Sequence, residues 1–199
     1  WTSWVTREPA SIFFDPARYH GLAIQISSGK GMTEVWNGDP TAYYPPGYPW
    51  FLGTMAWLAK PFTDEIWVVA GVTQAFLGAA SVILVAYVAR KLAGQKAGLV
   101  AGAVYALYPN LIFHTGVMLG ETLYIFFFLA FLAMILSRPW TSDFGLPRLL
   151  SSGVLLGLAV MVRPISLAVI PVVALVWLLA RKDWSAAIRW TAALCAGVA

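Results

Sequence analysis

Charge is scarce in this sequence. Only 11% of the 199 residues are charged, whereas soluble domains carry about 25%. Apolar residues make up 60% of the chain, and its mean hydropathy is +0.74. This composition predicts an integral membrane protein, so domain counts based on soluble chain lengths do not apply. The formal charge of +4 does not indicate a nucleic-acid partner, because the basic residues are spread among loops between apolar runs.

Cysteine and histidine are equally scarce. Cys195 is the single cysteine and lies in an apolar run, which excludes an internal disulfide. His20 and His114 lack the spacing of a metal motif, so no metal site is predicted from them. The sequence also lacks an initial Met and a basic-plus-apolar leader, and it stops inside an apolar run. We therefore expect it to be an incomplete portion of a longer protein.

Apolar runs follow residue 65 and predict the fold class, an all-α polytopic membrane bundle. A helix needs about 20 apolar residues to cross a bilayer, and the run 66–89 meets this without a charge. In the next run, Pro109-Asn110 should break or bend the helix. The predicted spans of this bundle, residues 66–199, are 66–89, 97–120, 121–137, 149–162, 165–180 and an incomplete 186–199.

The region 149–180 could be one kinked helix or two short helices that meet at Arg163-Pro164. Loop charges favour two, because short cytoplasmic loops are enriched in Lys and Arg, and two spans place eight of the thirteen basic residues on one side. These eight are Arg90, Lys91, Lys96, Arg138, Arg148, Arg181, Lys182 and Arg189. On that side the acids are Asp143 and Asp183, whereas the other side holds Glu8, Asp15, Glu34, Asp39, Asp64, Glu65 and Glu121.

Residues 1–65 are therefore predicted to form a large extracytoplasmic first loop. It should carry two helices along the membrane surface. Asp15 can cap the first, with Pro16 at its first position and an end at Gly29. Its apolar face would comprise Leu22, Ala23 and Ile26.

The second surface helix is expected at residues 48–60, which are too few to cross the membrane and contain tryptophans that suit its interface. Residues 31–47 should be loop. Within it, Pro45-Pro46-Gly47 predicts a stiff turn that folds the loop back, with Tyr43 and Tyr44 near the Asp15 end of the site. Arg18 and Lys30 are expected to be solvated loop charges, and the alternative is that either meets a phosphate.

Three segments in this order resemble the GT-C glycosyltransferases, and more narrowly the bacterial polyprenyl-phosphate-dependent branch related to protein mannosyltransferases and lipid A aminoarabinose transferases. The first segment ends in YPPGYPWFL, the second is PNLIFHTGVMLGE, and the third, GLAVMVRP, is similar to a GLA-x-x-x-RP pattern. The matching positions of the first segment are Asp15, Tyr19, Ala23, Gly29, Tyr44, Pro45, Pro46, Gly47, Pro49 and Leu52.

The resemblance implies a transferase that takes a sugar from a polyprenyl-phosphate donor at the extracytoplasmic face of the bacterial inner membrane, with inversion at the anomeric carbon. It implies that Asp15 is the general base that removes the acceptor's proton. Many members have a second acid next to this Asp, where this chain has Pro16. No cofactor is therefore predicted, and a divalent cation stays open. Membrane lipids and membrane-protein partners are expected, and the acceptor is undefined.

Each candidate residue also has a structural interpretation. Asp15 could serve only as a helix cap, Glu121 could be an acid favoured by a helix dipole rather than a second catalytic group, and Arg163 could be an interfacial turn residue rather than a clamp on the donor phosphate. The remaining candidates for substrate binding are Tyr19, His20, Tyr44 and His114.

Two other functional classes compete with the transferase. One is a non-catalytic GT-C-like membrane subunit or scaffold of a larger complex. The other is a secondary transporter, which the pattern disfavours, because transporter sites lie near the bilayer midplane and the polar groups here gather at one surface.

Overall fold

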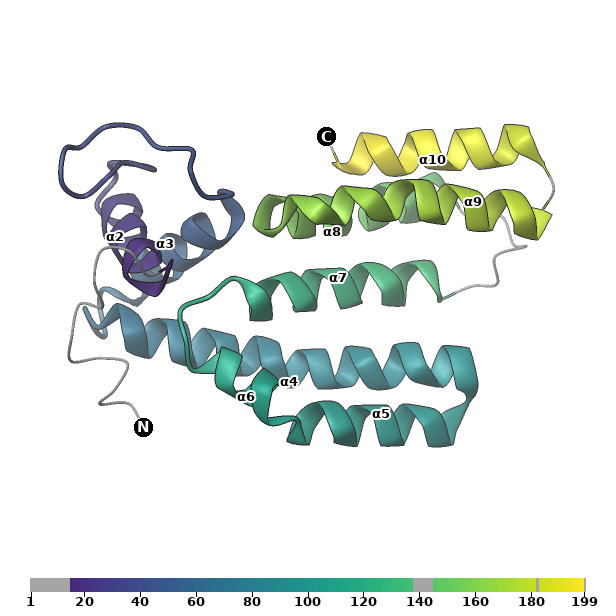
Figure 1. The fold of residues 1–199 in the computed structure, drawn as a ribbon, viewed down its shortest axis with the longest axis horizontal. Helices are drawn as coiled ribbons and strands as arrows, with labels where there is room; N and C mark the ends of the chain where they lie inside the picture. The colour runs from purple at the N-terminus through teal and green to yellow at the C-terminus, as the bar shows by residue number, and fades with distance from the viewer. Residues whose placement is uncertain (1–14, 138–144, 182, 199) are drawn as a thin grey trace. The chain divides into compact units, whose positions relative to one another are not determined.

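The computed structural model describes residues 15–137, 145–181 and 183–198. Within these ranges the regular elements are helices, together with an isolated bridge between Thr33 and Pro40, in agreement with the predicted all-α class (Figure 1). The chain forms two compact units, Trp1–Ala80 with Ala106–Leu123 and Ser81–Tyr105 with Tyr124–Ala199. Four residues used to predict sidedness lie outside the described ranges: Glu8, Arg138, Asp143 and Lys182.

The first unit begins with α2 (Asp15–Ser27), which ends at the glycine that the sequence indicates. Gly29 has a φ of 80°, and its N–H donates to the carbonyl of Ile26 at 3.0 Å. The N–H of Lys30 donates to the carbonyl of Gln25 at 2.9 Å. These two bonds are the Schellman arrangement that a left-handed glycine makes available at a helix C-terminus.

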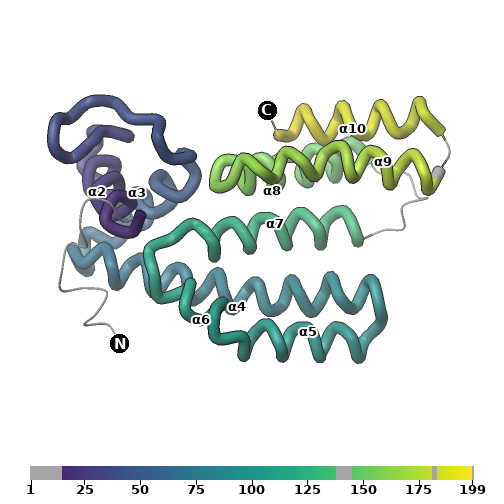
Figure 2. Tube along the Cα trace, in the orientation of Figure 1, coloured from purple at the N-terminus to yellow at the C-terminus, as the bar shows by residue number. Residues whose placement is uncertain are grey.

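The helix α3 (Gly47–Ala59) packs against α2. Figure 2 shows the intervening segment leaving α2 and returning to α3. Gly53 permits the contact, because a Cβ there would lie only 2.6 Å from the Cβ of Ile26. The face predicted for α2, comprising Leu22, Ala23 and Ile26, is buried, and so are Tyr48, Leu52 and Ala56 of α3.

The helix α4 (Ile66–Ala93) is the one described helix that by itself is long and apolar enough to cross a membrane. Its first part belongs to the first unit and its last part to the second. The helices α5 (Gln95–Leu107) and α6 (Pro109–Thr115) meet that criterion only as a pair, and a bend of 58° separates them. The break predicted at Pro109 is therefore present, because proline cannot continue a helix without losing a backbone hydrogen bond.

The second unit contains most of α7 (Glu121–Ile135), followed by α8 (Leu146–Val162), a 3-10 turn (Pro164–Ala168), α9 (Val169–Arg181) and α10 (Trp184–Val198). The extended backbone of Arg163 ends α8, so the region holds two helices rather than one kinked helix. At about 1.5 Å per residue, the 15 residues of α7 span less than a hydrocarbon core of roughly 30 Å. A bundle with several spans therefore remains a prediction.

The core of this unit forms where α7, α8, α9 and α10 pack together. Trp177 of α9 and Trp190 of α10 meet edge to face, with ring centroids 5.5 Å apart. The other buried members of the core are Phe131, Ile135, Leu149, Leu156, Val173, Ala186, Ala187 and Leu194.

Glycines set the approach of α8 to α10. A Cβ on Gly153 would lie 2.7 Å from the Cα of Gly197 and would also overlap the carbonyl oxygen of Leu194. A Cβ on Gly157 would lie 3.0 Å from the carbonyl oxygen of Val198. Close helix packing through small residues is a common solution in membranes, where burial of apolar surface does not drive helices together.

We predict that Gly153→Ala lowers the free energy of unfolding by about 1–3 kcal/mol, because the methyl group would force two backbones apart. Thermal unfolding of the purified protein in detergent measures this. Gly71→Ala is the control, since nothing lies within 4 Å of a Cβ at Gly71 in α4. An unfolding midpoint for Gly153→Ala equal to that of the wild type would contradict the close approach of α8 and α10.

Candidate functional site

The candidate site starts at Asp15, the first residue of α2. The side chain of Asp15 is exposed, and its Oδ1 accepts a hydrogen bond of 2.7 Å from the hydroxyl of Tyr44. The two residues are 29 positions apart in the chain, and the turn before α3 brings them together as the sequence predicts. The described residues make no hydrogen bond to Oδ2 of Asp15, so this oxygen can accept a proton from a bound molecule.

Tyr44 acts as a hydrogen-bond donor to this carboxylate over the whole neutral range. Burial raises the pKa of the Tyr44 hydroxyl, and the hydrogen bond to Asp15 and the charge of Asp15 raise it further. The nearby guanidinium of Arg18 opposes the shift. The phenol therefore stays protonated and holds the carboxylate in one orientation.

A cluster of four aromatic rings, Tyr19, Tyr43, Tyr44 and Tyr48, continues from this bond. The ring of Tyr44 lies 4.9 Å from that of Tyr43 and 4.9 Å from that of Tyr19. Tyr19 meets Tyr48 edge to face at 4.8 Å. Such pairs add about 0.5–1.5 kcal/mol beyond their burial. This tyrosine cluster therefore fixes the turn before α3 onto the helix that carries Asp15.

Gln74 of α4 anchors the inner end of the tyrosine cluster. Its Oε1 accepts a hydrogen bond of 2.9 Å from the hydroxyl of Tyr48, and both side chains are almost completely buried. The Nε2 of Gln74 donates to the carbonyls of Thr115 at 3.1 Å and Val117 at 2.9 Å. One amide thus binds α3 and the turn after α6 to α4. It satisfies the carbonyl of Thr115, which the end of α6 leaves free, and shares the carbonyl of Val117 with the N–H of Leu119, which donates to it at 2.8 Å.

This turn leads to Glu121, the first residue of α7. Burial raises the pKa of Tyr48, and the charges of Tyr19 and Glu121 add to the shift, so the Glu121 carboxylate lies within electrostatic reach of Tyr48. The hydroxyl of Thr122 donates to the backbone carbonyl of His114 at 3.1 Å. Asp15 and Glu121 therefore belong to one unit, and the tyrosine cluster joins their surroundings.

The two histidines occupy different surroundings. His20 stacks on Trp67 of α4, with ring centroids 4.8 Å apart and an interplanar angle of 15°. The ring of His114 contacts Phe113 at 5.7 Å, and its Nδ1 is buried without a hydrogen bond to any described residue. A bound hydroxyl could satisfy this nitrogen. The structure thus brings Tyr19 and Tyr44 to Asp15 and gives His20 an aromatic partner of its own.

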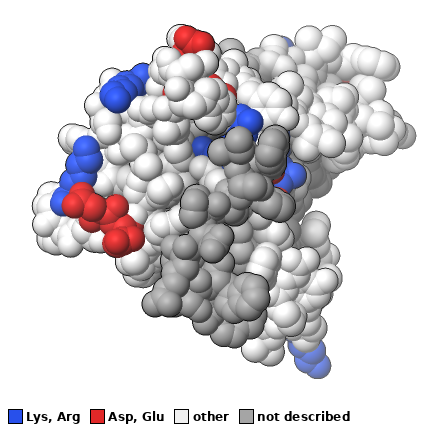
Figure 3. Space-filling model, turned by 60° about the vertical axis from the view of Figure 1, so that its left-hand side comes forward, with Lys and Arg blue, Asp and Glu red and all other residues white. Residues whose placement is uncertain are grey.

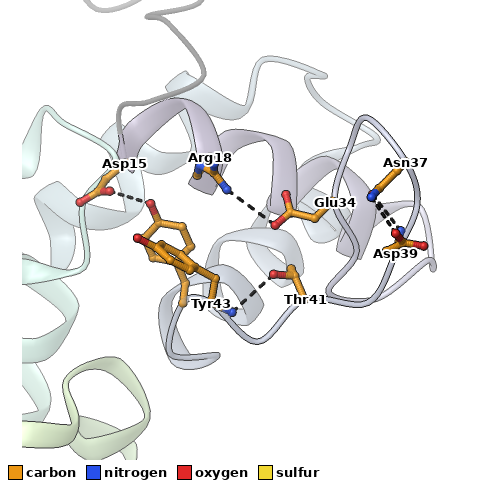
Figure 4. A network of polar contacts seen from close by, with 8 residues as sticks. Asp15, Arg18, Glu34, Asn37, Asp39, Thr41 and Tyr43 are labelled. Carbon is orange, nitrogen blue, oxygen red and sulfur yellow. Dashed lines mark hydrogen bonds and ion pairs between the residues drawn. The ribbon is translucent and has the colours of Figure 1, made fainter.

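Arg18 differs from the prediction of a solvated loop charge. It lies on α2, and its Nη1 is 3.6 Å from Oε1 of Glu34 (Figure 4). Its guanidinium carbon lies 5.0 Å from the ring centroid of Trp36 and 5.7 Å from that of Tyr43. Arg18 therefore holds the loop after α2 against the helix that carries Asp15. The prediction failed because the acid that pairs with Arg18 is 16 residues away.

Arg163 belongs to the second unit and is exposed, with an extended backbone (φ −140°, ψ 104°) between α8 and the following 3-10 turn. Its role as a phosphate clamp stays a prediction. In the ranges that the structure covers, no group of three or more His, Cys, Asp or Glu side chains is placed to hold a metal ion.

Sequence reasoning missed Gln74 and Tyr48. Gln74 is a large polar side chain in the apolar run that forms α4. Polar side chains inside membrane segments are costly, face protein partners and mark functional regions. That rule was the available signal for Gln74. Nothing in the sequence singles out Tyr48, because it lies among aromatic residues that suit a membrane interface equally well.

Comparison with known proteins adds the family. The family model described as dolichyl-phosphate-mannose-protein mannosyltransferase matches residues 44–199, which is more than half of the chain. The chain therefore belongs to this family of membrane-embedded, GT-C-like glycosyltransferases, as the resemblance of its motifs predicts. The matched range starts at Tyr44 and leaves out Asp15. No curated protein and no solved structure matches the chain.

We predict that Gln74→Leu lowers the free energy of unfolding by about 1–3 kcal/mol for each buried polar group that loses its partner. The groups affected are the hydroxyl of Tyr48 and the carbonyl of Thr115, whereas the carbonyl of Val117 keeps its hydrogen bond from the N–H of Leu119. Thermal unfolding in detergent measures the loss, with Gln95→Leu at the exposed start of α5 as the matched control. Equal unfolding midpoints for the two variants would show that the hydrogen bonds of Gln74 do not stabilise the contact of α4 with α3 and with the turn after α6.

His20 predicts a loss of stability in acid. Burial lowers the pKa of His20 below its ordinary value of 6.5, and the charge of Glu65 partly opposes this. His20 therefore binds a proton more readily in the unfolded chain than in the folded one. The stability that neutral, buried His20 contributes is complete above pH 6.5, and it is lost as the pH falls through the pKa of His20 in the folded protein.

The unfolding midpoint should decrease as the pH is lowered from about 7.5 to about 5.5. His20→Phe should make the midpoint less dependent on pH while keeping the stack on Trp67. Glu65→Gln should make it more dependent on pH, because the negative charge that favours protonated His20 is lost. A pH dependence that neither substitution changes would contradict the role of His20.

Proposed function

We propose that the protein transfers a sugar from a polyprenyl-phosphate donor to an acceptor hydroxyl at the extracytoplasmic membrane face, with inversion and with Asp15 as the general base. The family supports transfer from a lipid-linked sugar. The observation that carries the assignment to Asp15 is the 2.7 Å hydrogen bond from Tyr44, the first residue of the range that the family model matches.

The proposed chemistry uses the two oxygens of Asp15 differently. Tyr44 binds Oδ1 and fixes the carboxylate, which leaves Oδ2 to accept the proton of the acceptor hydroxyl. The acceptor oxygen then forms its bond to the anomeric carbon while the bond from that carbon to the phosphate oxygen breaks. Positioned carboxylates contribute typically about 10²–10⁴-fold to such proton transfers.

The remaining predicted residues have supporting roles in this proposal. Arg163 would bind the departing phosphate, which suits the planar donors of a guanidinium. Glu121 would orient the acceptor, and His114 would donate to or accept from a sugar hydroxyl through its buried Nδ1. Tyr19 supports the ring of Tyr44 and so acts on the carboxylate indirectly. His20 would hold α2, the helix that carries Asp15, against α4 through its stacking on Trp67.

The membrane topology belongs to the same proposal. We infer several spans, with the basic turn after α4, which contains Arg90 and Lys91, on the cytoplasmic side. The acids Asp15 and Glu121 would then face the side where a translocated donor is exposed. The bacterial inner membrane is the proposed location.

The test is sugar transfer by the purified protein from polyprenyl-phosphate mannose that carries a labelled sugar, with mannose chosen from the family's description. Asp15→Asn should lower turnover by at least about 100-fold, because the amide cannot accept the proton. Asp64→Asn makes the same chemical change at an exposed acid between α3 and α4 and should leave turnover near that of the wild type.

Unchanged turnover in folded Asp15→Asn protein would remove Asp15 as the base. A folded wild-type protein that transfers no sugar to any membrane acceptor would instead favour a non-catalytic subunit. An equal unfolding midpoint for Asp15→Asn and the wild type establishes that a loss of turnover is chemical.

A further inference from the structure

A groove of about 450 Å³ lies between the C-terminal end of α2 and one face of α3. Neither Asp15 nor Tyr44 lines this groove. Its wall on the α3 side includes Trp50, Thr54 and Trp57. These residues are four and three positions apart, so they form one stripe along the helix. Trp50 is 48% exposed and Trp57 is 59% exposed, so both rings are open to a ligand.

Polar groups are gathered at one end of this groove. Lys60 follows α3 and donates one N–H to the carbonyl of Ser27 at 2.7 Å, which caps the C-terminus of α2. An ammonium carries three donors, so two remain for a ligand. Ser28 and Thr54, which carry hydroxyl groups, also line the groove. Among the described residues, none that lines the groove is acidic, and Asp64 lines a separate cavity that Lys60 also lines.

Apolar side chains continue outward beside this polar end. Leu58 is 52% exposed, and Phe62, in the turn after α3, is 89% exposed. Among the described residues in the view of Figure 3, most are uncharged, and the charged ones form small groups. A lysine with hydroxyls next to exposed Trp, Leu and Phe side chains matches the chemical change from headgroups to acyl chains at a membrane surface.

We propose that this groove is a binding site for the phosphate of an anionic phospholipid headgroup. The Lys60 ammonium and the hydroxyls of Ser28 and Thr54 bind the phosphate oxygens. The rings of Trp50 and Trp57 cover the glycerol region, and Phe62 enters the acyl layer. Bound lipid then fixes α3, whose other side carries Tyr48 and the tyrosine cluster. The site is separate from the one proposed for the sugar donor.

The experiment reconstitutes the protein in nanodiscs of phosphatidylcholine and phosphatidylglycerol and brominates the acyl chains of one lipid at a time. Bromine quenches nearby tryptophan, so the ratio of the two quenching curves gives the local preference for the anionic lipid. The chain has ten tryptophans. The signal of Trp50 and Trp57 is therefore obtained by subtracting a variant in which both are Phe.

We expect the wild type to prefer phosphatidylglycerol at these two rings. Lys60→Gln should weaken that preference about five-fold, as expected for one lysine at an anionic surface. Lys30→Gln removes an equal charge from a nearby residue that does not line the groove, and it should keep the preference. Lys60→Arg should also keep it, since charge and donors remain.

Thr54→Val provides a test that does not disturb the cap of α2 and should reduce the preference in a folded protein. Three outcomes would overturn the proposal: equal preference in Lys60→Gln and the wild type, an equal loss in Lys30→Gln, or loss of the wild-type preference when inorganic phosphate is added. The second outcome would indicate general surface charge, and the third would indicate a site for a soluble anion.

Discussion

The amide of Gln74 is the constraint on which the candidate site depends. A buried polar group in an apolar segment must find hydrogen-bond partners, because leaving it without them costs more than the bonds contribute. Gln74 satisfies this requirement with the hydroxyl of Tyr48 and the carbonyls of Thr115 and Val117. It thereby joins the α3 helix and the turn before Glu121 to α4, the longest of the described helices.

The tyrosine cluster connects the buried amide of Gln74 to the exposed carboxylate of Asp15. Tyr48 contacts Tyr19, Tyr19 contacts Tyr44, and Tyr44 binds the carboxylate of Asp15. Each ring has two side-chain torsions, so a packed row of rings loses little conformational freedom when it orders. A rigid row of this kind suits a general base, which must hold its oxygen within hydrogen-bond reach of a reacting hydroxyl.

Local rules predicted several elements well. The end of α2 at Gly29 depends on a residue that permits a left-handed backbone. The break at Pro109 and the separation of α8 from α9 at Arg163 depend on prolines, which cannot continue a helix and restrict the residue before them. The approach of Tyr44 to Asp15 followed from a stiff proline turn. The bonds of Gln74 and the pairing of Arg18 with Glu34 were not predictable, because periodicity shows which face is polar but not which distant group it meets.

A cryo-electron microscopy map of the protein with a bound polyprenyl-phosphate sugar would show whether Asp15 is placed to act as the general base. If Asp15 is the general base, the sugar lies beside Asp15 and Tyr44, with the anomeric carbon open to an acceptor oxygen within hydrogen-bond reach of Oδ2 of Asp15. A sugar bound with no contact to Asp15, Tyr44 or Glu121 would contradict the proposed role of Asp15 as the general base.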